Sequence, residues 1–289
     1  MRNFDLIRPA SLAEAINLLN DGDESTRVMS GGTALMLMMK TGLYAPKRLI
    51  CLSALADRHS AIETDDEGAV FIGSNASLSI LETSPIIHRS APVIARAMKK
   101  LANVRVRNVA RVGGALAHGD PHMDLPPILA ALGGELHLAG PQGERKIAVE
   151  SFYTGYLETA LMRGEIITVV RLPPQSGWSS AYLKCTTRAA DDWPTVGVAA
   201  SLRIVSGVIE DARIMVGAAT ERLTRLTQAE AALRMAVADT AGFERAAQAA
   251  AAEAETVDSA SGSAAYKTEL LRVFVRRTLA EALLNGAVQ

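Results

Sequence analysis

Two pairs of adjacent glycines are the residues with the clearest chemical potential in this chain. The first lies in residues 30–34 (Ser-Gly-Gly-Thr-Ala) and the second in residues 111–115 (Arg-Val-Gly-Gly-Ala). A strand that enters the first pair and a helix that follows it would present free backbone N–H groups and a positive helix dipole. Because glycine lacks a Cβ, a diphosphate can approach such a backbone closely. Spacing alone leaves open the alternative that the glycines only satisfy turn geometry.

Residues 118–124 (His-Gly-Asp-Pro-His-Met-Asp) bring together two imidazoles and two carboxylates, which are common metal ligands. His118 and His122 would need a helix to share one face, and Pro121 disfavours a helix there. The sequence therefore favours a turn in which Asp120 hydrogen-bonds a ligand hydroxyl and Asp124 caps the following helix. We predict no metal site.

Cationic and aromatic side chains form two further candidate groups. The first group consists of Lys99, Lys100, Arg105, Arg107 and Arg111. These side chains either face a phosphate or an acidic partner, or form a solvated helix end. The other begins the C-terminal part of the chain with Lys184, Arg188, Asp191, Asp192 and Trp193. Its indole either stacks on a flat cofactor or anchors a domain boundary.

Composition and missing motifs exclude several classes of protein. The 289 residues carry a net charge of −1, which argues against a nucleic-acid partner. The fingerprints of a Rossmann nicotinamide site, a P-loop, a zinc protease and an α/β-hydrolase are all absent. Two cysteines, Cys51 and Cys185, cannot form a disulfide framework or ligate an iron–sulfur cluster alone. Without an apolar N-terminal segment or a run of about 18 apolar residues, we expect a cytoplasmic protein with no membrane span.

The elements that must position these residues follow from hydrophobic periodicity and turn signals. Ser11 and Glu14 form a capping box that begins the first helix. The expected strands before residue 173 are 27–29, 49–52, 69–74, 136–139 and 166–172, and the further expected helices are 34–41, 78–82, 92–101 and 125–132. Residues 109–118 show no helical period. After a linker at 173–177, we expect an antiparallel hairpin of 199–205 with 212–218, then helices at 227–238, 243–254 and 266–284.

With these residues in place, the chain resembles a known family. Residues 111–127 resemble the segment T-I-G-G-N-x-A-x-x-D-P-x-x-D-x-P-P of the flavoprotein medium subunits of the xanthine dehydrogenase and carbon monoxide dehydrogenase family. Residues 30–35 resemble that family's first flavin loop, A-G-G-(H/T)-(S/D)-L. The resemblance covers essentially the whole chain, through Pro85, 147–156, 164–167, Lys184, Arg188, 192–194, 264–266 and 276–277.

The resemblance implies an α+β fold with FAD held between two lobes. Residues 1–174 would form the FAD-binding domain, with a small βαβ lobe at about 1–55 and a larger α+β lobe at 56–174. Residues 178–289 would form a small C-terminal domain of antiparallel sheet plus helices. The implied FAD contacts are Val28, Met29, Ser30, Gly31, Gly32, Thr33, Ala34, Leu35, Gly113, Gly114 and Ala115 at the diphosphate, Leu101, Ala102, Ala110 and Ala117 along the cofactor, Asp120 and Asp124 at ribose or adenine, and Ile167, Lys184 and Trp193 at the flavin.

The resemblance also implies partner subunits. FAD would belong to this chain, whereas molybdopterin would lie on a large subunit and two [2Fe–2S] clusters on a small one, and the subunits would assemble as a dimer of heterotrimers. This chain would then transfer electrons to an external acceptor and contain no catalytic residue of its own. Three positions depart from the pattern: Ala115 replaces an Asn, Ala34 a common polar residue, and Arg111 a Thr. The two alanines suggest an alternative, a degenerate scaffold with weak FAD binding, while Arg111 can pair with a phosphate.

Overall fold

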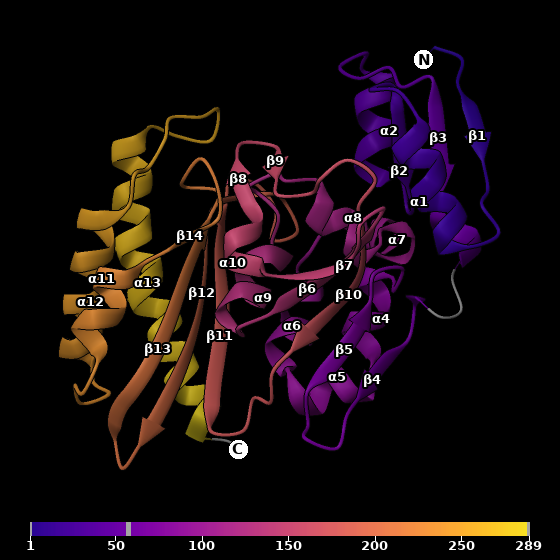
Figure 1. Ribbon diagram of the computed structural model, residues 1–289. Coiled ribbons are helices and arrows are strands. Elements are labelled where there is room, and N and C mark those ends of the chain that lie inside the picture. The colour runs from indigo at the N-terminus through magenta and orange to yellow at the C-terminus, as the bar shows by residue number, and fades with distance from the viewer. Residues whose placement is uncertain (1, 56–58, 288–289) are drawn as a thin grey trace.

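The computed structural model describes residues 2–55 and 59–287, and its three larger sheets follow one another across the molecule (Figure 1). A small N-terminal lobe, a larger central lobe and a C-terminal sheet with its own helices follow one another along the chain. The predicted α+β class with two lobes and an antiparallel C-terminal domain is confirmed. The predicted lobe boundary reaches residue 56, which lies outside the described residues. Among the described residues, no helix combines the length and apolarity needed to cross a membrane.

The small lobe is a βαβ unit with a parallel sheet, as the periodicity predicts. Its strands β1 (Asp5–Ile7), β3 (Arg48–Cys51) and β2 (Thr26–Met29) pair in that order, and its helices are α1 (Leu12–Asp21), α2 (Thr33–Lys40) and the 3-10 turn η1 (Leu52–Leu55). The Ser11 hydroxyl caps α1 by accepting from the Glu14 N–H at 3.1 Å. The Glu14 carboxylate accepts from the N–H of Ala10 rather than that of Ser11, at 2.7 Å. The lobe therefore begins with a variant of the expected capping box.

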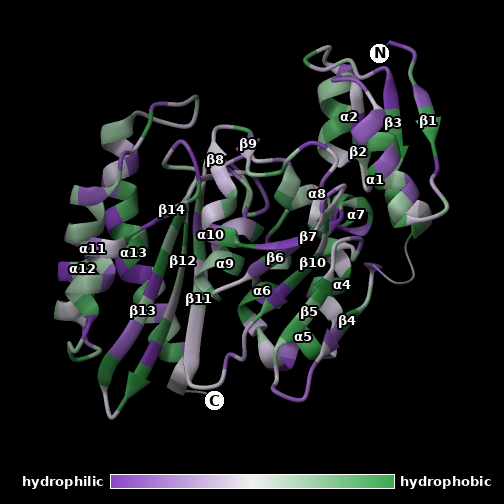
Figure 2. Cartoon of the chain, viewed as in Figure 1, coloured by the Kyte–Doolittle hydropathy of each residue, from purple (hydrophilic) through white to green (hydrophobic). Residues whose placement is uncertain are grey.

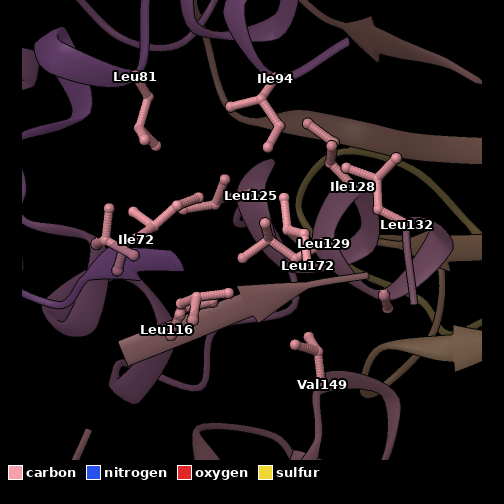
Figure 3. Packing of buried hydrophobic residues seen from close by; sticks show 14 of the residues in the cluster. Ile72, Leu81, Ile94, Leu116, Leu125, Ile128, Leu129, Leu132, Val149 and Leu172 are labelled. Atoms are coloured by element: carbon pink, nitrogen blue, oxygen red, sulfur yellow. The ribbon is translucent and has the colours of Figure 1, made fainter. Parts of the chain in front are cut away.

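The larger lobe wraps short helices around a five-stranded antiparallel sheet. The sheet order is β4 (Ile62–Thr64), β5 (Val70–Gly73), β10 (Ile166–Leu172), β6 (Glu135–Gly140) and β7 (Gly143–Ala148). The helices are α4 (Leu78–Thr83), α5 (Pro85–Ser90), α6 (Pro92–Met98), α7 (Val104–Val109), α8 (Val112–Ala117), α9 (Leu125–Ala131) and α10 (Val149–Phe152), and a small ladder joins β8 (Tyr153–Gly155) to β9 (Glu158–Thr159). Figure 3 shows Ile72 of β5 and Leu172 of β10 facing Leu116, Ile94 and Leu125 from the helices. This core fixes the helices that surround the second glycine pair.

The C-terminal sheet is buried on both faces. Its order is β11 (Trp178–Thr186), β12 (Pro194–Val205), β13 (Val208–Gly217) and β14 (Thr224–Arg225), and α11 (Thr227–Leu233), α12 (Thr240–Glu253) and α13 (Ala264–Ala287) cover one face. Successive residues of a strand point to opposite faces. Val198 and Val216 accordingly pack in the core beneath the helices, whereas Ala199 and Met215 pack in the core of the larger lobe. Apolar residues therefore run through neighbouring positions of β12 and of the second half of β13, whereas the first half of β13 also carries charged residues (Figure 2).

Two expectations about residues 109–124 were wrong. Residues 112–117 form the helix α8, although the sequence shows no helical period there. Tertiary contacts override the local pattern, because the N–H groups of Val112 and Gly113 donate to the carbonyls of Ala76 and Ser74 at 3.0 and 2.7 Å. Asp124 also precedes α9 without capping it, because its backbone is itself helical and its carboxylate has other partners.

The other differences concern the length of one helix and several strands that were not expected. The helix expected at 227–238 ends at Leu233 as α11. The strands β4, β7, β8, β9 and β11 were not expected, since their sequences alternate weakly or are exposed on one side. The hairpin about Ser206 and Gly207 is confirmed as β12 and β13.

Candidate functional site

A cavity of about 430 Å³ lies where the small lobe meets the larger one. Its wall combines the segment from β2 into α2, the residues that follow β5, the second glycine pair on α8, the start of β10, and Trp193 from the C-terminal domain. Cavities of several hundred Å³ between lobes are typical sites for cofactors. The lining is predominantly apolar, which suits flat ring systems.

The first glycine pair joins β2 to α2 at the edge of this cavity. Gly32 is the N-terminal cap of α2 and has a φ of 71°, a conformation that L side chains rarely adopt. No side chain caps α2, so its first N–H groups remain available at the cavity wall. Gly31 serves a different need, because a Cβ there would lie 2.2 Å from the carbonyl oxygen of Val109 in the larger lobe. The pair therefore combines a free helix start with a close contact between lobes.

The second glycine pair divides its roles in a similar way. A Cβ on Gly113 would lie 2.9 Å from the Cβ of Ser74, so this glycine permits α8 to pack against the end of β5. A Cβ on Gly114 would meet no protein atom within 4 Å, although Gly114 lines the cavity. Gly114 is therefore the glycine whose missing side chain leaves space for a ligand rather than for the protein itself.

The structure brings nearly all residues proposed as cofactor contacts to this one cavity. Those that line it are Val28, Met29, Ser30, Gly31, Gly32, Thr33, Ala34, Leu35, Leu101, Ala102, Ala110, Arg111, Gly113, Gly114, Ala115, Ala117, Ile167 and Trp193. Asp120, Asp124 and Lys184 are the exceptions, because they lie behind the wall and contact protein groups. Direct contact of any of these residues with a cofactor stays a prediction.

Asp120 is held by His122 and through it indirectly supports Trp193. One carboxylate oxygen accepts from the backbone N–H of His122 and contacts its ring Nδ1, both at 2.8 Å. Burial acts to raise the pKa of Asp120, but the hydrogen bonds from His122 outweigh it and lower the pKa. The His122 ring stacks on Trp193 with centroids 5.9 Å apart. Burial lowers the pKa of His118, a cavity-lining residue, against the opposing influence of Asp120, and this favours its neutral form.

Asp124 is part of a buried cluster with Tyr182 and Lys184. The Tyr182 hydroxyl donates to one carboxylate oxygen at 2.5 Å, and Lys184 Nζ donates to the other at 3.2 Å. Burial raises the pKa of Asp124, while Lys184 and Tyr182 act to lower it. Lys184 Nζ also donates to the carbonyl of Asp192 at 2.8 Å. The cluster therefore fixes the loop that carries Trp193 to the cavity.

Three charged residues, Arg27, Arg111 and Glu165, line the cavity and make it compatible with an anion. Among the described residues, the Arg111 guanidinium has no carboxylate partner, and it lines the cavity. Glu165 also lines the wall, but Arg145 binds both of its oxygens, at 2.6 and 2.8 Å. That contact lowers the pKa of Glu165 and neutralises its charge. The remaining field near the glycine pairs is therefore positive.

Of the five cationic residues between 99 and 111, Arg107 has a structural role that the sequence did not reveal. It is buried, forms an ion pair with Glu82 at 3.1 Å, and donates to the carbonyls of Leu101 and Ala102 at 2.9 and 2.6 Å. Ala102 has a φ of 45°, an uncommon conformation for alanine. Arg107 thus holds a strained turn against the cavity.

Asn75 is a second functional position that sequence reasoning missed. It is buried at the cavity wall, accepts from the Ser30 hydroxyl at 2.6 Å, and donates to the carbonyl of Leu52 at 2.9 Å. It therefore ties the first glycine loop to the larger lobe. The one signal for Asn75 in the sequence was its position directly after the strand predicted at 69–74. Among the described residues, no group of three or more His, Cys, Asp or Glu side chains is arranged to hold a metal ion.

These features fit a dinucleotide flavin. The open space beside Gly114, the free start of α2 and the unpaired Arg111 suit a diphosphate. The apolar lining suits adenine and flavin rings. Fold and cavity together are those expected of a protein that holds a large anionic cofactor between two lobes.

Comparisons with known proteins specify the family. Residues 2–175 match the family described as the FAD binding domain in molybdopterin dehydrogenase, and residues 181–282 match the CO dehydrogenase flavoprotein C-terminal domain. The carbon monoxide dehydrogenase medium chain of Afipia carboxidovorans is 30% identical over 97% of this chain and 96% of its own. The nicotine 6-hydroxylase medium subunit of Paenarthrobacter nicotinovorans is 30% identical over 95% of each chain.

Solved structures agree with the sequence matches. Carbon monoxide dehydrogenase from Hydrogenophaga pseudoflava superimposes with a TM-score of 0.94 at 31% identity, over 98% of both chains. Quinoline 2-oxidoreductase from Pseudomonas putida 86 gives a TM-score of 0.91 at 27% identity, over 98% of both chains. The chain belongs to the family of FAD-binding medium subunits of molybdenum hydroxylases, and it is an oxidoreductase subunit whose cofactor is FAD.

Replacing Arg111 tests the charge of the site. We expect Arg111→Ala to weaken FAD binding by about 10- to 100-fold, because a hydrogen bond to a charged group contributes roughly 1.5–3 kcal/mol. Arg111→Lys, which keeps the charge but loses the planar fork, should retain part of the affinity. Titration of the apoprotein with FAD measures both. Equal affinity in all three proteins would mean that Arg111 does not face the diphosphate.

Proposed function

We propose that this chain is the FAD-carrying electron-transfer subunit of a heteromeric molybdenum hydroxylase or dehydrogenase. It would take electrons from the [2Fe–2S] clusters of a small partner subunit and deliver them to an external acceptor. The observation that carries the proposal is the cavity between the lobes, where the two glycine pairs and the unpaired Arg111 meet.

The residues around the cavity divide the binding of FAD between them. Gly32, Gly114 and Arg111 would hold the diphosphate, and Ile167 and Trp193 would contact the flavin end. FAD supplies a centre that accepts electrons singly and releases them in pairs. The protein keeps the cavity wall fixed through Asn75 and excludes competing negative charge by pairing Glu165 with Arg145.

The assembly and the division into domains are part of the proposal. A large molybdopterin subunit and a small iron–sulfur subunit would complete the enzyme as a dimer of heterotrimers. The names of the relatives, which are medium chains or subunits, support a heteromeric assembly. We place the division between an FAD-binding domain and a C-terminal domain in the linker that joins β10 to β11, between the two family matches. The cytoplasmic location stays a prediction from the sequence.

Co-purification tests this function. The chain is expressed together with the products of neighbouring genes, and the complex is isolated by size exclusion. We expect one FAD per chain from the visible spectrum and from release on denaturation, with molybdenum and iron present in the complex but absent from this chain alone. A chain that never associates with iron- or molybdenum-containing partners would contradict the assembly.

The degenerate scaffold is the second candidate, and Ala115 and Ala34 favour it because both replace polar side chains at the cavity wall. The same experiment separates the two. A complex that forms with molybdenum and iron but shows no flavin bands and releases no FAD would support the scaffold and exclude the electron-transfer role.

A further inference from the structure

A buried lysine of the C-terminal domain lies far along the chain from the cofactor cavity. Lys267 is on α13, which packs on the face of the C-terminal sheet away from the larger lobe (Figure 1). It is fully buried, and its Nζ donates to the carbonyl of Ala218 at 3.2 Å. Burial lowers the pKa of Lys267, against the opposing influence of Asp258. Because a buried amino group is costly to keep, the position of Ala218 decides what this lysine can do.

Ala218 joins the end of β13 to a turn of the larger lobe. This turn, residues 118–124 between α8 and α9, is called the wall turn below. The backbone N–H of Ala218 donates to the carbonyl of Pro121 at 2.8 Å, so one residue accepts from Lys267 and donates to the wall turn. Ala218 has a φ of 65°, in the left-handed region that alanine rarely adopts. Such a conformation persists only where the surroundings hold it, and Lys267 supplies one of the contacts that do so.

Two glycines that face one another across the C-terminal sheet leave room for the wall turn. Gly217 of β13 pairs directly with Gly197 of β12. A Cβ on Gly217 would lie 3.0 Å from the carbonyl oxygen of Pro121, and a Cβ on Gly197 would lie 2.7 Å from the Tyr182 hydroxyl oxygen. That hydroxyl donates to Asp124 at the end of the wall turn. The sheet therefore fits closely against the turn at two points.

The wall turn also forms part of the cofactor cavity. His118 and Met123 line the cavity directly. His122 contributes indirectly, because its ring stacks on Trp193, which lines the cavity as well. Pro121 lies between these residues in the chain, so a displacement of its carbonyl would move side chains that border the cofactor space.

We propose that Lys267 is a positioning residue of the FAD site. By holding Ala218, it fixes the carbonyl of Pro121 and so keeps the wall turn and the ring of Trp193 at the cavity. Lys267 does not line the cavity and acts only through these contacts. The inference rests on FAD as the cofactor and is independent of the proposed electron-transfer role.

The fluorescence of Trp193 reports the position of the wall turn in the full chain without FAD. The chain has two tryptophans, so Trp178→Phe leaves Trp193 as the single indole. In this background, we expect Lys267→Met to shift the emission of Trp193 to longer wavelength and to increase its quenching by acrylamide, because the indole loses its contact with His122. FAD binding should weaken by about 2- to 30-fold, the range for residues that act on a site without touching its ligand. Emission and FAD affinity that both stay at the parental values would overturn the proposal.

Two further variants separate positioning from stability. Lys267→Arg keeps a charged donor and should retain the emission and the FAD affinity of the parent. Val275→Ala shortens a fully buried side chain on the same helix, and it should lower the melting temperature without changing either readout. Equal changes in Lys267→Met and Val275→Ala would contradict a positioning role, because they would reflect lost stability alone. Equal losses in the Arg and Met variants would exclude the donor as the cause.

Gly217→Ala tests the same link from the sheet and does not depend on whether Lys267→Met folds. Gly217 has no positive φ, so its backbone suits alanine, but the added Cβ presses on the carbonyl of Pro121. We expect the same direction of change in Trp193 emission, and a combined effect with Lys267→Met that is less than additive, because both act on one turn. Unchanged emission in Gly217→Ala would show that the sheet does not position the wall turn, and the proposal would fail.

Discussion

A Gly114→Val variant is expected to lose FAD while its apoprotein remains as stable as the wild type. A Cβ at this position would meet no protein atom within 4 Å outside its chain neighbours and its own helix backbone, and Gly114 lines the cavity between the lobes. Gly114 lies inside α8 without a positive φ, so valine is tolerated there, and helix propensity changes by less than about 0.5 kcal/mol. The substitution thus removes space from the ligand and leaves the protein's own packing unchanged.

The expected loss is large. Forcing extra methyl groups into a filled site costs about 1–3 kcal/mol, and the upper end corresponds to roughly a hundredfold weaker binding. Measurements are the FAD-to-protein ratio after gel filtration, the dissociation constant from titration of the apoprotein, and the melting temperature of the apoprotein. Retention of a full complement of FAD by Gly114→Val would exclude this cavity as the flavin site.

A contrasting glycine provides the control. Gly31→Ala should lower both the stability of the apoprotein and the retention of FAD, because its Cβ would lie 2.2 Å from the backbone oxygen of Val109. Backbone atoms cannot move aside as a flexible side chain can, so the two lobes must separate. A cofactor site is therefore distinguished by the pair of results: Gly114→Val affects FAD alone, whereas Gly31→Ala affects both.

The two glycine pairs illustrate what the sequence could predict. The first pair follows the strand β2 and precedes the helix α2, and both elements form where the sequence pattern indicates. The second pair lies in α8, which no local pattern signals, because its position is fixed by hydrogen bonds to residues 74 and 76 and by packing against Ser74. Motif resemblance supplied the second pair where periodicity failed.

Three polar residues behind the cavity wall show what a motif resemblance cannot predict. Sequence resemblance placed Asp120, Asp124 and Lys184 against the cofactor, whereas their side chains contact protein groups in the structure. A motif reports that a carboxylate is needed at a position, but it does not report which atom the carboxylate binds. Asp124 and Lys184 are 60 residues apart and meet only because β11 packs beside the start of α9. Local sequence contains no signal for such a pair.

Because the Lys184 side chain contacts Asp124 in the structure, we expect Lys184→Met to lower the free energy of unfolding by a large amount. The side chains of Lys184 and Asp124 are only 6% and 8% exposed, so their ion pair is buried. Removing one partner of a buried pair costs about 3–5 kcal/mol, because a charge remains without compensation. Arg203→Met is the matched control, since its pair with Glu210 is 53% and 37% exposed and should contribute no more than about 1 kcal/mol. Denaturant unfolding of the apoproteins measures both values.

The pH dependence of the unfolding free energy of Lys184→Met identifies the cause of its lost stability. Burial already raises the pKa of Asp124, and loss of Lys184 removes an influence that lowers it. A carboxyl whose pKa is higher in the folded than in the unfolded chain stabilises the fold below the unfolded value, and that stability is lost as the pH rises through the folded value. The deficit of Lys184→Met should therefore be smaller at acid pH and grow toward neutral and alkaline pH. A deficit that is constant with pH would indicate lost packing rather than a buried charge.

A double variant completes the argument. Asp124→Asn in the Lys184→Met background removes the uncompensated charge, and the new side chain still offers an oxygen to the Tyr182 hydroxyl. We expect it to recover most of the lost stability and to lose the additional pH dependence, because replacing a buried pair by neutral groups is often nearly neutral. A direct flavin contact by Lys184 predicts the reverse: an apoprotein of normal stability, weak FAD binding and no rescue. Together, the unfolding curves and FAD affinities of the two variants decide whether Lys184 acts on the protein or on its cofactor.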